Sequence, residues 1–172
     1  MSIAGLGLVL AAAQANAGTE AGKFELTASV ADTAEVVGNN SGLNSVDATL
    51  GFGYFLTSAI EVKGNVIGVW STGKGSSNTL LYFLVGPDYN FNLGADSKLV
   101  PYVGAYGGGV YYGPSSGSSS FFPAFDAHLG LKYFVTERTS INAQVSYQEY
   151  FGNSTTGDVG SVITSIGISY FF

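Results

Sequence analysis

The side chains with the clearest chemical potential are charged residues set among apolar ones. Asp126 and His128, the only histidine, lie two residues apart and would share one face of an extended strand. A histidine held by a carboxylate and close to a serine is the arrangement of a hydrolase. Serines are frequent here and no catalytic motif accompanies the pair, so we expect no catalytic residues and no enzyme.

Two other features fall short of a ligand site. The glycines of Gly104 to Gly109 lack the following Lys-Ser/Thr and helix of a phosphate loop. Glu35 and neighbouring asparagines supply too few ligands for a calcium site in the segment Thr33 to Asn44. With no cysteine in the chain, thiolate metal sites are excluded. We expect no metal and no cofactor.

The elements that must position these residues follow from composition. Hydrophobic residues make up 46% of 172 residues, yet no stretch of the body reaches the ~20 apolar residues of a membrane-spanning helix. A closed sheet is the other structure that pairs every backbone group inside a bilayer. The net charge of −6, with only six Lys and Arg, argues against nucleic-acid binding.

Alternation with a period of two recurs along the chain and predicts strands with one face in lipid. Eight such segments are found, so the predicted fold is all-β, an eight-stranded antiparallel up-and-down transmembrane β-barrel with both termini periplasmic. The predicted strands are 23–32, 45–55, 59–71, 79–92, 98–112, 121–135, 140–151 and 159–172. The connections 56–58, 93–97 and 136–139 are short, whereas 33–44, 72–78, 113–120 and 152–158 are longer and would be extracellular.

The alternation divides side chains into an outward apolar face and an inward polar one. The fifth segment is the least clear, and there we assign Val100, Tyr102, Tyr106 and Val110 outward. An eight-stranded barrel is just wide enough for side chains to fill it, so inward charges should pair. The predicted polar network of the lumen consists of Glu25, Asp47, Glu61, Lys63, Asp88, Asp126, His128 and Lys132. A narrow cation-preferring pore lined by the excess acid is the alternative.

Aromatic residues should mark the two membrane interfaces, because such rings favour the boundary between lipid and headgroups. One predicted belt comprises Phe24, Tyr54, Tyr89, Phe91, Tyr102, Tyr133, Tyr170 and Phe172. The other comprises Trp70, Tyr112, Phe121, Tyr147 and Phe151.

Residues 1–17 combine an apolar run with an Ala-Asn-Ala ending, the pattern of a signal peptide. A signal peptide normally opens with Lys or Arg, which this segment lacks, so either the true translation start lies upstream or the first Met is internal to the signal. We expect residues 18–172 to form the mature barrel domain of an exported protein in a bacterial outer membrane.

The last strand, Ser165-Ile-Gly-Ile-Ser-Tyr-Phe-Phe172, resembles the terminal strand of outer-membrane barrels. The phrases Gly51-Phe-Gly-Tyr-Phe-Leu56 and Pro101-Tyr-Val-Gly-Ala-Tyr-Gly-Gly-Gly109 resemble small OmpA-type and OmpX-like barrels. This resemblance implies that Tyr170 and Phe172 are an assembly signal read by the barrel-assembly machinery. We expect no peptidoglycan-binding domain, because the sequence ends at Phe172.

The leading functional hypothesis is a structural or surface-interaction role in the cell envelope, performed by the outer face and the loops. Its expected partners are outer-membrane lipid, lipopolysaccharide and the assembly machinery, with a protein partner or a homo-oligomer left open. The alternatives are the small cation-preferring pore and a lipid-modifying enzyme. A soluble barrel is the alternative fold.

Overall fold

A computed structural model describes residues 19–37, 45–73, 76–94, 97–114, 119–152 and 157–172. The predicted signal segment 1–17 lies outside these residues. No helix long and apolar enough to cross a membrane is found among them.

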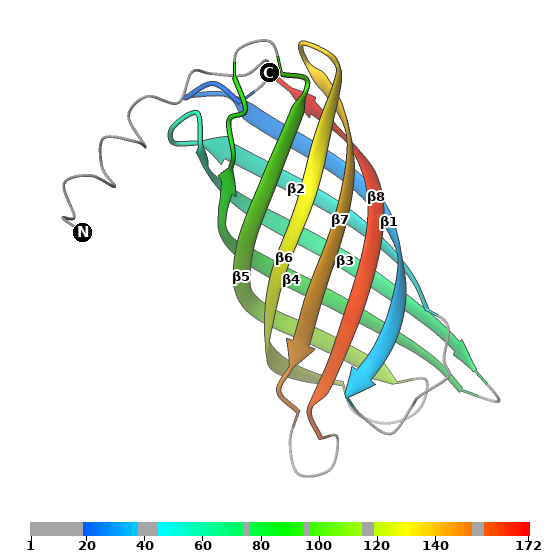
Figure 1. Cartoon of the computed structure of the whole chain (residues 1–172). Coiled ribbons are helices and arrows are strands. Elements are labelled where there is room, and N and C mark those ends of the chain that lie inside the picture. Colours follow the sequence, from blue (N-terminus) through cyan, green and yellow to red (C-terminus); the bar gives the residue numbers. More distant parts are fainter. Residues whose placement is uncertain (1–18, 38–44, 74–75, 95–96, 115–118, 153–156) are drawn as a thin grey trace, which may run out of the picture.

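The described chain forms one closed antiparallel barrel in which each strand pairs with the next along the sequence (Figure 1). Pairing of the first strand with the last closes the ring, so the sheet has no free edge. The strands are β1 (Phe24–Val37), β2 (Ser45–Phe55), β3 (Ile60–Gly73), β4 (Ser76–Asn90), β5 (Leu99–Pro114), β6 (Ser120–Thr136), β7 (Thr139–Tyr150) and β8 (Val159–Phe171). The prediction of an eight-stranded up-and-down barrel is confirmed.

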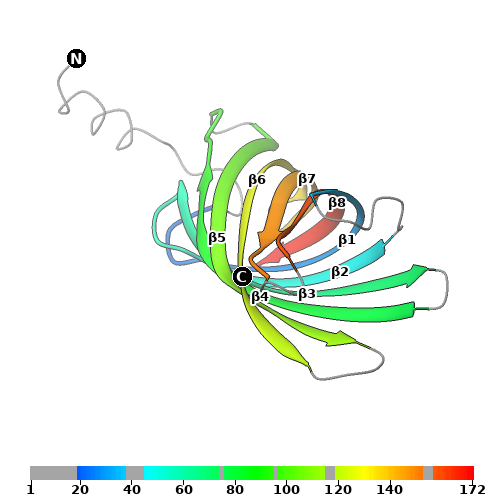
Figure 2. The same cartoon turned by 90° about the horizontal axis from the view of Figure 1, so that it is seen from below.

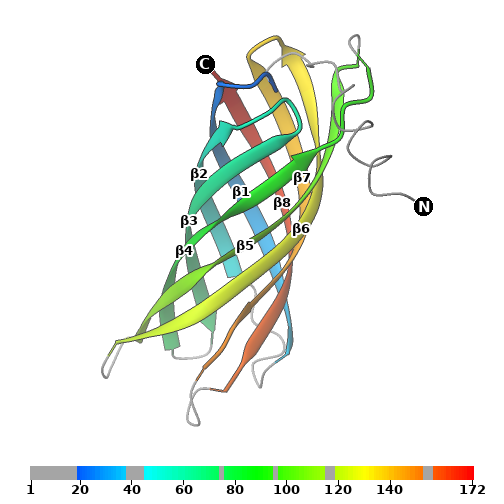
Figure 3. The same cartoon turned by 90° about the vertical axis from the view of Figure 1, so that its left-hand side faces the viewer.

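The barrel has two unlike ends. At the terminal end β1 begins and β8 ends, and the amide of Phe24 donates to the carbonyl of Phe172 at 2.9 Å. The β2–β3, β4–β5 and β6–β7 connections lie at this end, and the other four connections lie at the end that we call the opposite end (Figure 3). The paired ends of β3 and β4 and those of β5 and β6 project outward there when the barrel is viewed from below (Figure 2).

Several strands run further than the sequence predicted. β1 continues to Val37 because Thr33 to Val37 pair with β8, with a bulge between Glu35 and Val37. The predicted loop 72–78 is mostly ladder, since Ser71 pairs with Asn78 and Gly73 with Ser76. Polar and glycine residues that are typical of loops continue these strands because a paired neighbour satisfies their backbone groups.

The predicted faces of β5 are wrong. Val100, Tyr102, Tyr106 and Val110 point into the barrel and are 0–5% exposed, whereas Val103 between them is 41% exposed. The register decides the orientation, because Tyr106 lies opposite the inward Asp126 of β6. Apolar residues occupy both faces of this strand, so alternation of polarity carries no signal there.

Two predicted interface aromatics change place as a consequence. Tyr102 is buried in the lumen, and Tyr112 is partly buried and packs against the interior apolar cluster. Tyr111 takes the outward position instead.

Pro87 of β4 is exposed on the outer face. The β4–β5 ladder has no pair at Gly86 and Pro87, and it continues beyond them in the same register.

Candidate functional site

The inward faces of the strands bring the charged residues of the chain together in the lumen. Eight of them are at most 6% exposed: Glu25, Asp47, Glu61, Lys63, Asp88, Asp126, His128 and Lys132. They form two hydrogen-bonded clusters, from which Asp47 stands apart.

The lysine cluster consists of Glu25, Glu61, Lys63 and Lys132. Lys132 Nζ lies 2.5 Å from Glu25 Oε2 and 3.0 Å from Glu61 Oε2. Lys63 Nζ lies 2.8 Å from Glu25 Oε1 and 3.9 Å from Glu61 Oε1. Two lysines therefore balance two glutamates, which is what a buried set of charges requires.

Neutral side chains complete the hydrogen bonding of Glu25. The hydroxyls of Thr27 and Ser169 donate to Glu25 Oε1 at 2.8 Å and 2.5 Å. Asn142 Nδ2 donates to Ser169 Oγ at 2.5 Å. Alternation along the strands predicts an inward position for all three residues, but nothing in the sequence singles them out, because neutral polar residues recur on the inward faces of several strands.

A plug of four apolar side chains closes the lumen at the terminal end. Phe55, Val100, Phe134 and Phe171 form one cluster and are 0–2% exposed. Lys132 Nζ lies 5.3 Å from the centroid of the Phe55 ring and 5.6 Å from that of Phe171, so the plug supports the lysine cluster through cation–π contacts.

The histidine cluster consists of Asp88, Tyr106, Asp126 and His128. His128 Nδ1 lies 2.6 Å from Asp126 Oδ1, and Nε2 lies 2.8 Å from Asp88 Oδ1. The Tyr106 hydroxyl donates to Asp88 Oδ1 at 2.7 Å. A neutral imidazole carries one N–H, so only the protonated ring donates to both carboxylates at once.

This geometry does not suit the hydrolase hypothesis. A general base in a hydrolase needs one ring nitrogen free to accept the proton of a serine hydroxyl. Both nitrogens of His128 are occupied by carboxylates, and the side chain is fully buried. The arrangement favours a bridge between Asp88 and Asp126 over a catalytic pair.

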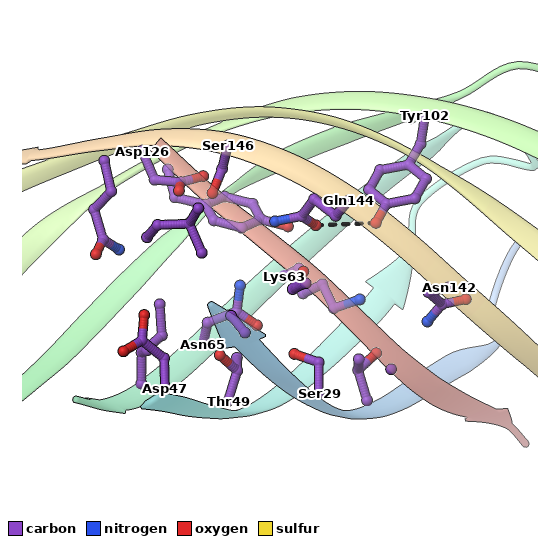
Figure 4. A pocket seen from close by; sticks show the side chains of 18 residues that line it. Ser29, Asp47, Thr49, Lys63, Asn65, Tyr102, Asp126, Asn142, Gln144 and Ser146 are labelled. Atoms are coloured by element: carbon purple, nitrogen blue, oxygen red, sulfur yellow. Dashed lines mark hydrogen bonds between the residues drawn. The ribbon is translucent and has the colours of Figure 1, made fainter. Parts of the chain in front are cut away.

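Between the clusters and the opposite end lies a polar cavity of about 60 Å³ (Figure 4). Asp47 and Asp126 line it together with Thr49, Asn65 and Ser146. The hydroxyl of Thr33 donates to Asp47 Oδ2, but Asp47 Oδ1 has no hydrogen-bond partner although the residue is 1% exposed.

A second apolar cluster lies in the lumen towards the opposite end, on the side formed by strands β3 to β7. It comprises Val69, Tyr82, Leu84, Tyr106, Val110, Phe122, Ala124 and Tyr150. Apolar side chains therefore fill the lumen at the terminal end, and they fill one side of the lumen towards the opposite end.

No group of three or more His, Cys, Asp or Glu side chains that could hold a metal is found in the described part of the chain.

The outer face is apolar. Leu26, Leu50, Val66, Ile166 and Ile168 are 42–65% exposed on it. At the terminal end, Phe24 contacts the rings of Tyr54 and Phe172 with centroids 4.9 Å and 5.8 Å apart.

The other proposed belt residues lie on the same surface. At the terminal end, the rings of Tyr89 and Phe91 are in contact, and Tyr133 and Tyr170 are exposed on the same outer surface. At the opposite end, Trp70, Phe121 and Phe151 are exposed, and the Tyr147 hydroxyl donates to Glu149 Oε2.

No family model matches the sequence, and no curated protein matches it. Solved structures do match the fold. The Neisserial surface protein A, NspA, superposes with a TM-score of 0.75 at 18% identity over 87% of this chain and 98% of that one. The chain has the fold of a small outer-membrane β-barrel.

Two further structures share this barrel fold. The outer membrane protein OprG of Pseudomonas aeruginosa matches with a TM-score of 0.61 at 17% identity, covering 90% of this chain and 98% of that one. The outer membrane enzyme PagL matches with a TM-score of 0.58 at 16% identity, covering 83% and 97%. One fold thus carries proteins of different function, and function must be argued from the side chains.

Proposed function

We propose that this chain is an integral outer-membrane barrel with a closed lumen, and that it acts through its outer face and its opposite end. In this proposal both termini are periplasmic and the opposite end faces the outside of the cell. Partners would be outer-membrane lipid, lipopolysaccharide or a protein bound at the opposite end, in an adhesive or envelope-stabilising role.

The observation that carries this proposal is the plug at the terminal end. Phe55, Val100, Phe134 and Phe171 close the lumen, and the lysine cluster packs directly on Phe55 and Phe171. An ion crossing the barrel would have to displace both layers. The large apolar outer surface supports a membrane location, since so much exposed apolar area is unfavourable in water.

A cation-preferring pore is the second candidate, because the described residues of the lumen include five carboxylates but two lysines. Recordings in planar bilayers decide between the two. We expect the wild-type protein to be silent where a known porin conducts. Single-channel steps that shrink in Asp126→Asn would establish the pore and overturn the closed lumen.

The barrel fold that this chain shares with PagL keeps an enzymatic alternative open to test. Replacement His128→Ala should leave the acylation pattern of lipid A unchanged, because both ring nitrogens bind carboxylates. An altered acylation pattern in cells with wild-type amounts of folded protein would show that the barrel modifies lipid.

A further inference from the structure

Among the described residues, the charges of the lumen do not balance, and the excess adjoins one cavity. Lys63 and Lys132 offset Glu25 and Glu61 in the lysine cluster. A protonated His128 offsets one of the two charges of Asp88 and Asp126, and one negative charge remains in the histidine cluster.

Asp47 adds a second uncompensated charge. Among the residues that the structure describes, no lysine, arginine or histidine pairs with it, and its hydrogen-bond partner is the neutral hydroxyl of Thr33. Its Oδ1 atom has no partner although the residue is 1% exposed. A buried carboxylate oxygen without a partner is costly, so a group that neutralises it would stabilise the fold.

Asp47 and Asp126 line the same cavity from opposite walls (Figure 4). Lys63 lines it as well, but its Nζ is bound to Glu25 at 2.8 Å and its charge is already offset. The two uncompensated charges found among the described lumen residues thus adjoin one cavity.

The remaining lining supplies neutral oxygens from Thr49, Asn65 and Ser146. Carboxylate, amide and hydroxyl oxygens are ligands of hard cations, and Ca²⁺ accepts six to eight of them in flexible geometry. The cavity of about 60 Å³ has room for an ion with a few water molecules, since about 15 Å³ suffices for one water.

We propose that this cavity binds one Ca²⁺ ion, with Asp47 as the principal ligand and Asp126 on the facing wall. The ion neutralises the two excess charges of the lumen. It reaches the site from the opposite end, because the plug of Phe55, Val100, Phe134 and Phe171 closes the terminal end.

Calorimetric titration of Ca²⁺ into the full chain, folded in an uncharged detergent with choline chloride as the background salt, tests the proposal. We expect saturable binding of one ion per chain and a rise in the unfolding temperature. The variant Asp47→Asn should weaken binding at least about tenfold, as expected for the loss of a ligand. Asp32→Asn is the matched control, because Asp32 is exposed on the neighbouring strand beside Val46.

A second variant keeps the test decisive if Asp47→Asn does not fold. Thr49→Val removes one oxygen from the cavity lining with little change in side-chain shape, and it should weaken Ca²⁺ binding. A difference in gel mobility between heated and unheated samples shows whether each variant is folded. The proposal is overturned if no saturable binding occurs, or if folded variants bind as tightly as wild type. Equal stabilisation by Na⁺ at the same ionic strength would also overturn it.

Discussion

Lys132 is the buried cation with the closest contacts to the carboxylates of the lumen. Its Nζ binds both Glu25 and Glu61 and lies over the rings of the plug. Removing one member of a buried ion pair leaves its partner uncompensated, which typically costs about 3–5 kcal/mol. We expect Lys132→Met to lower the free energy of unfolding in urea by an amount of this order.

The matched control is Lys98→Met, because Lys98 is exposed at the terminal end. This variant should unfold at nearly the wild-type urea concentration. Equal stability of Lys132→Met and wild type would show that the lysine cluster is not needed for the fold.

The alternation of inward and outward positions along each strand predicts which charged residues face the lumen, but it does not predict which of them form pairs. Glu25 takes partners from β1, β3, β6 and β8, and a single sequence does not show which inward residues of distant strands lie at one height. The outward prediction for Tyr102 is wrong because apolar residues occupy both faces of β5. The Tyr102 hydroxyl donates to Gln144 at 2.9 Å in the lumen, a contact that depends on the strand register.

At the scale of the strands, seven of the eight outward faces follow the polarity of the sequence, and β5 does not. The inward side chains of β5 pack into apolar parts of the lumen, where polarity no longer separates inside from outside. Glycines of β5 and of its neighbour β4 make room for this packing. A Cβ atom at Gly104 would lie 2.1 Å from Asp88 Oδ1 and 2.5 Å from His128 Nε2.

Gly104→Ala should therefore disturb the histidine cluster and destabilise the barrel by about 1–3 kcal/mol, the usual cost of overpacking. Gly64→Ala is the control, because a Cβ atom there would have its nearest neighbour at 3.9 Å. Urea unfolding followed by gel mobility measures both. Equal effects of the two substitutions would contradict the crowding at Gly104.

The last strand permits a test of the proposed assembly signal. Phe172 and Phe151 are similarly exposed, at 50% and 45%, but lie at opposite ends of the barrel. We expect Phe172→Ala to reduce the amount of folded protein in the outer membrane of cells, with little effect on refolding in detergent. Phe151→Ala should affect neither. A defect of Phe172→Ala that is equally strong in both settings would show a packing role instead of a signal.

For the whole molecule, the even number of strands places both ends of the barrel on one side of the membrane, and we propose that this side is the periplasm. The sequence contains no cysteine, so single cysteines can report this orientation without interference. We expect Ser119→Cys, at the opposite end, to react with an impermeant maleimide on intact cells. Thr57→Cys, in the β2–β3 turn, should react only after the outer membrane is permeabilised. The reverse pattern would invert the proposed topology.

The apolar outer face of this barrel should lie in lipid, and the fluorescence of the single tryptophan reports whether it does. Trp70 is 53% exposed on the outer face of β3, towards the opposite end. In vesicles containing brominated lipids, its fluorescence should be strongly quenched, and most strongly by bromine placed near the headgroups. Emission that brominated lipids leave unchanged, while a water-soluble quencher reduces it, would contradict the membrane-embedded barrel.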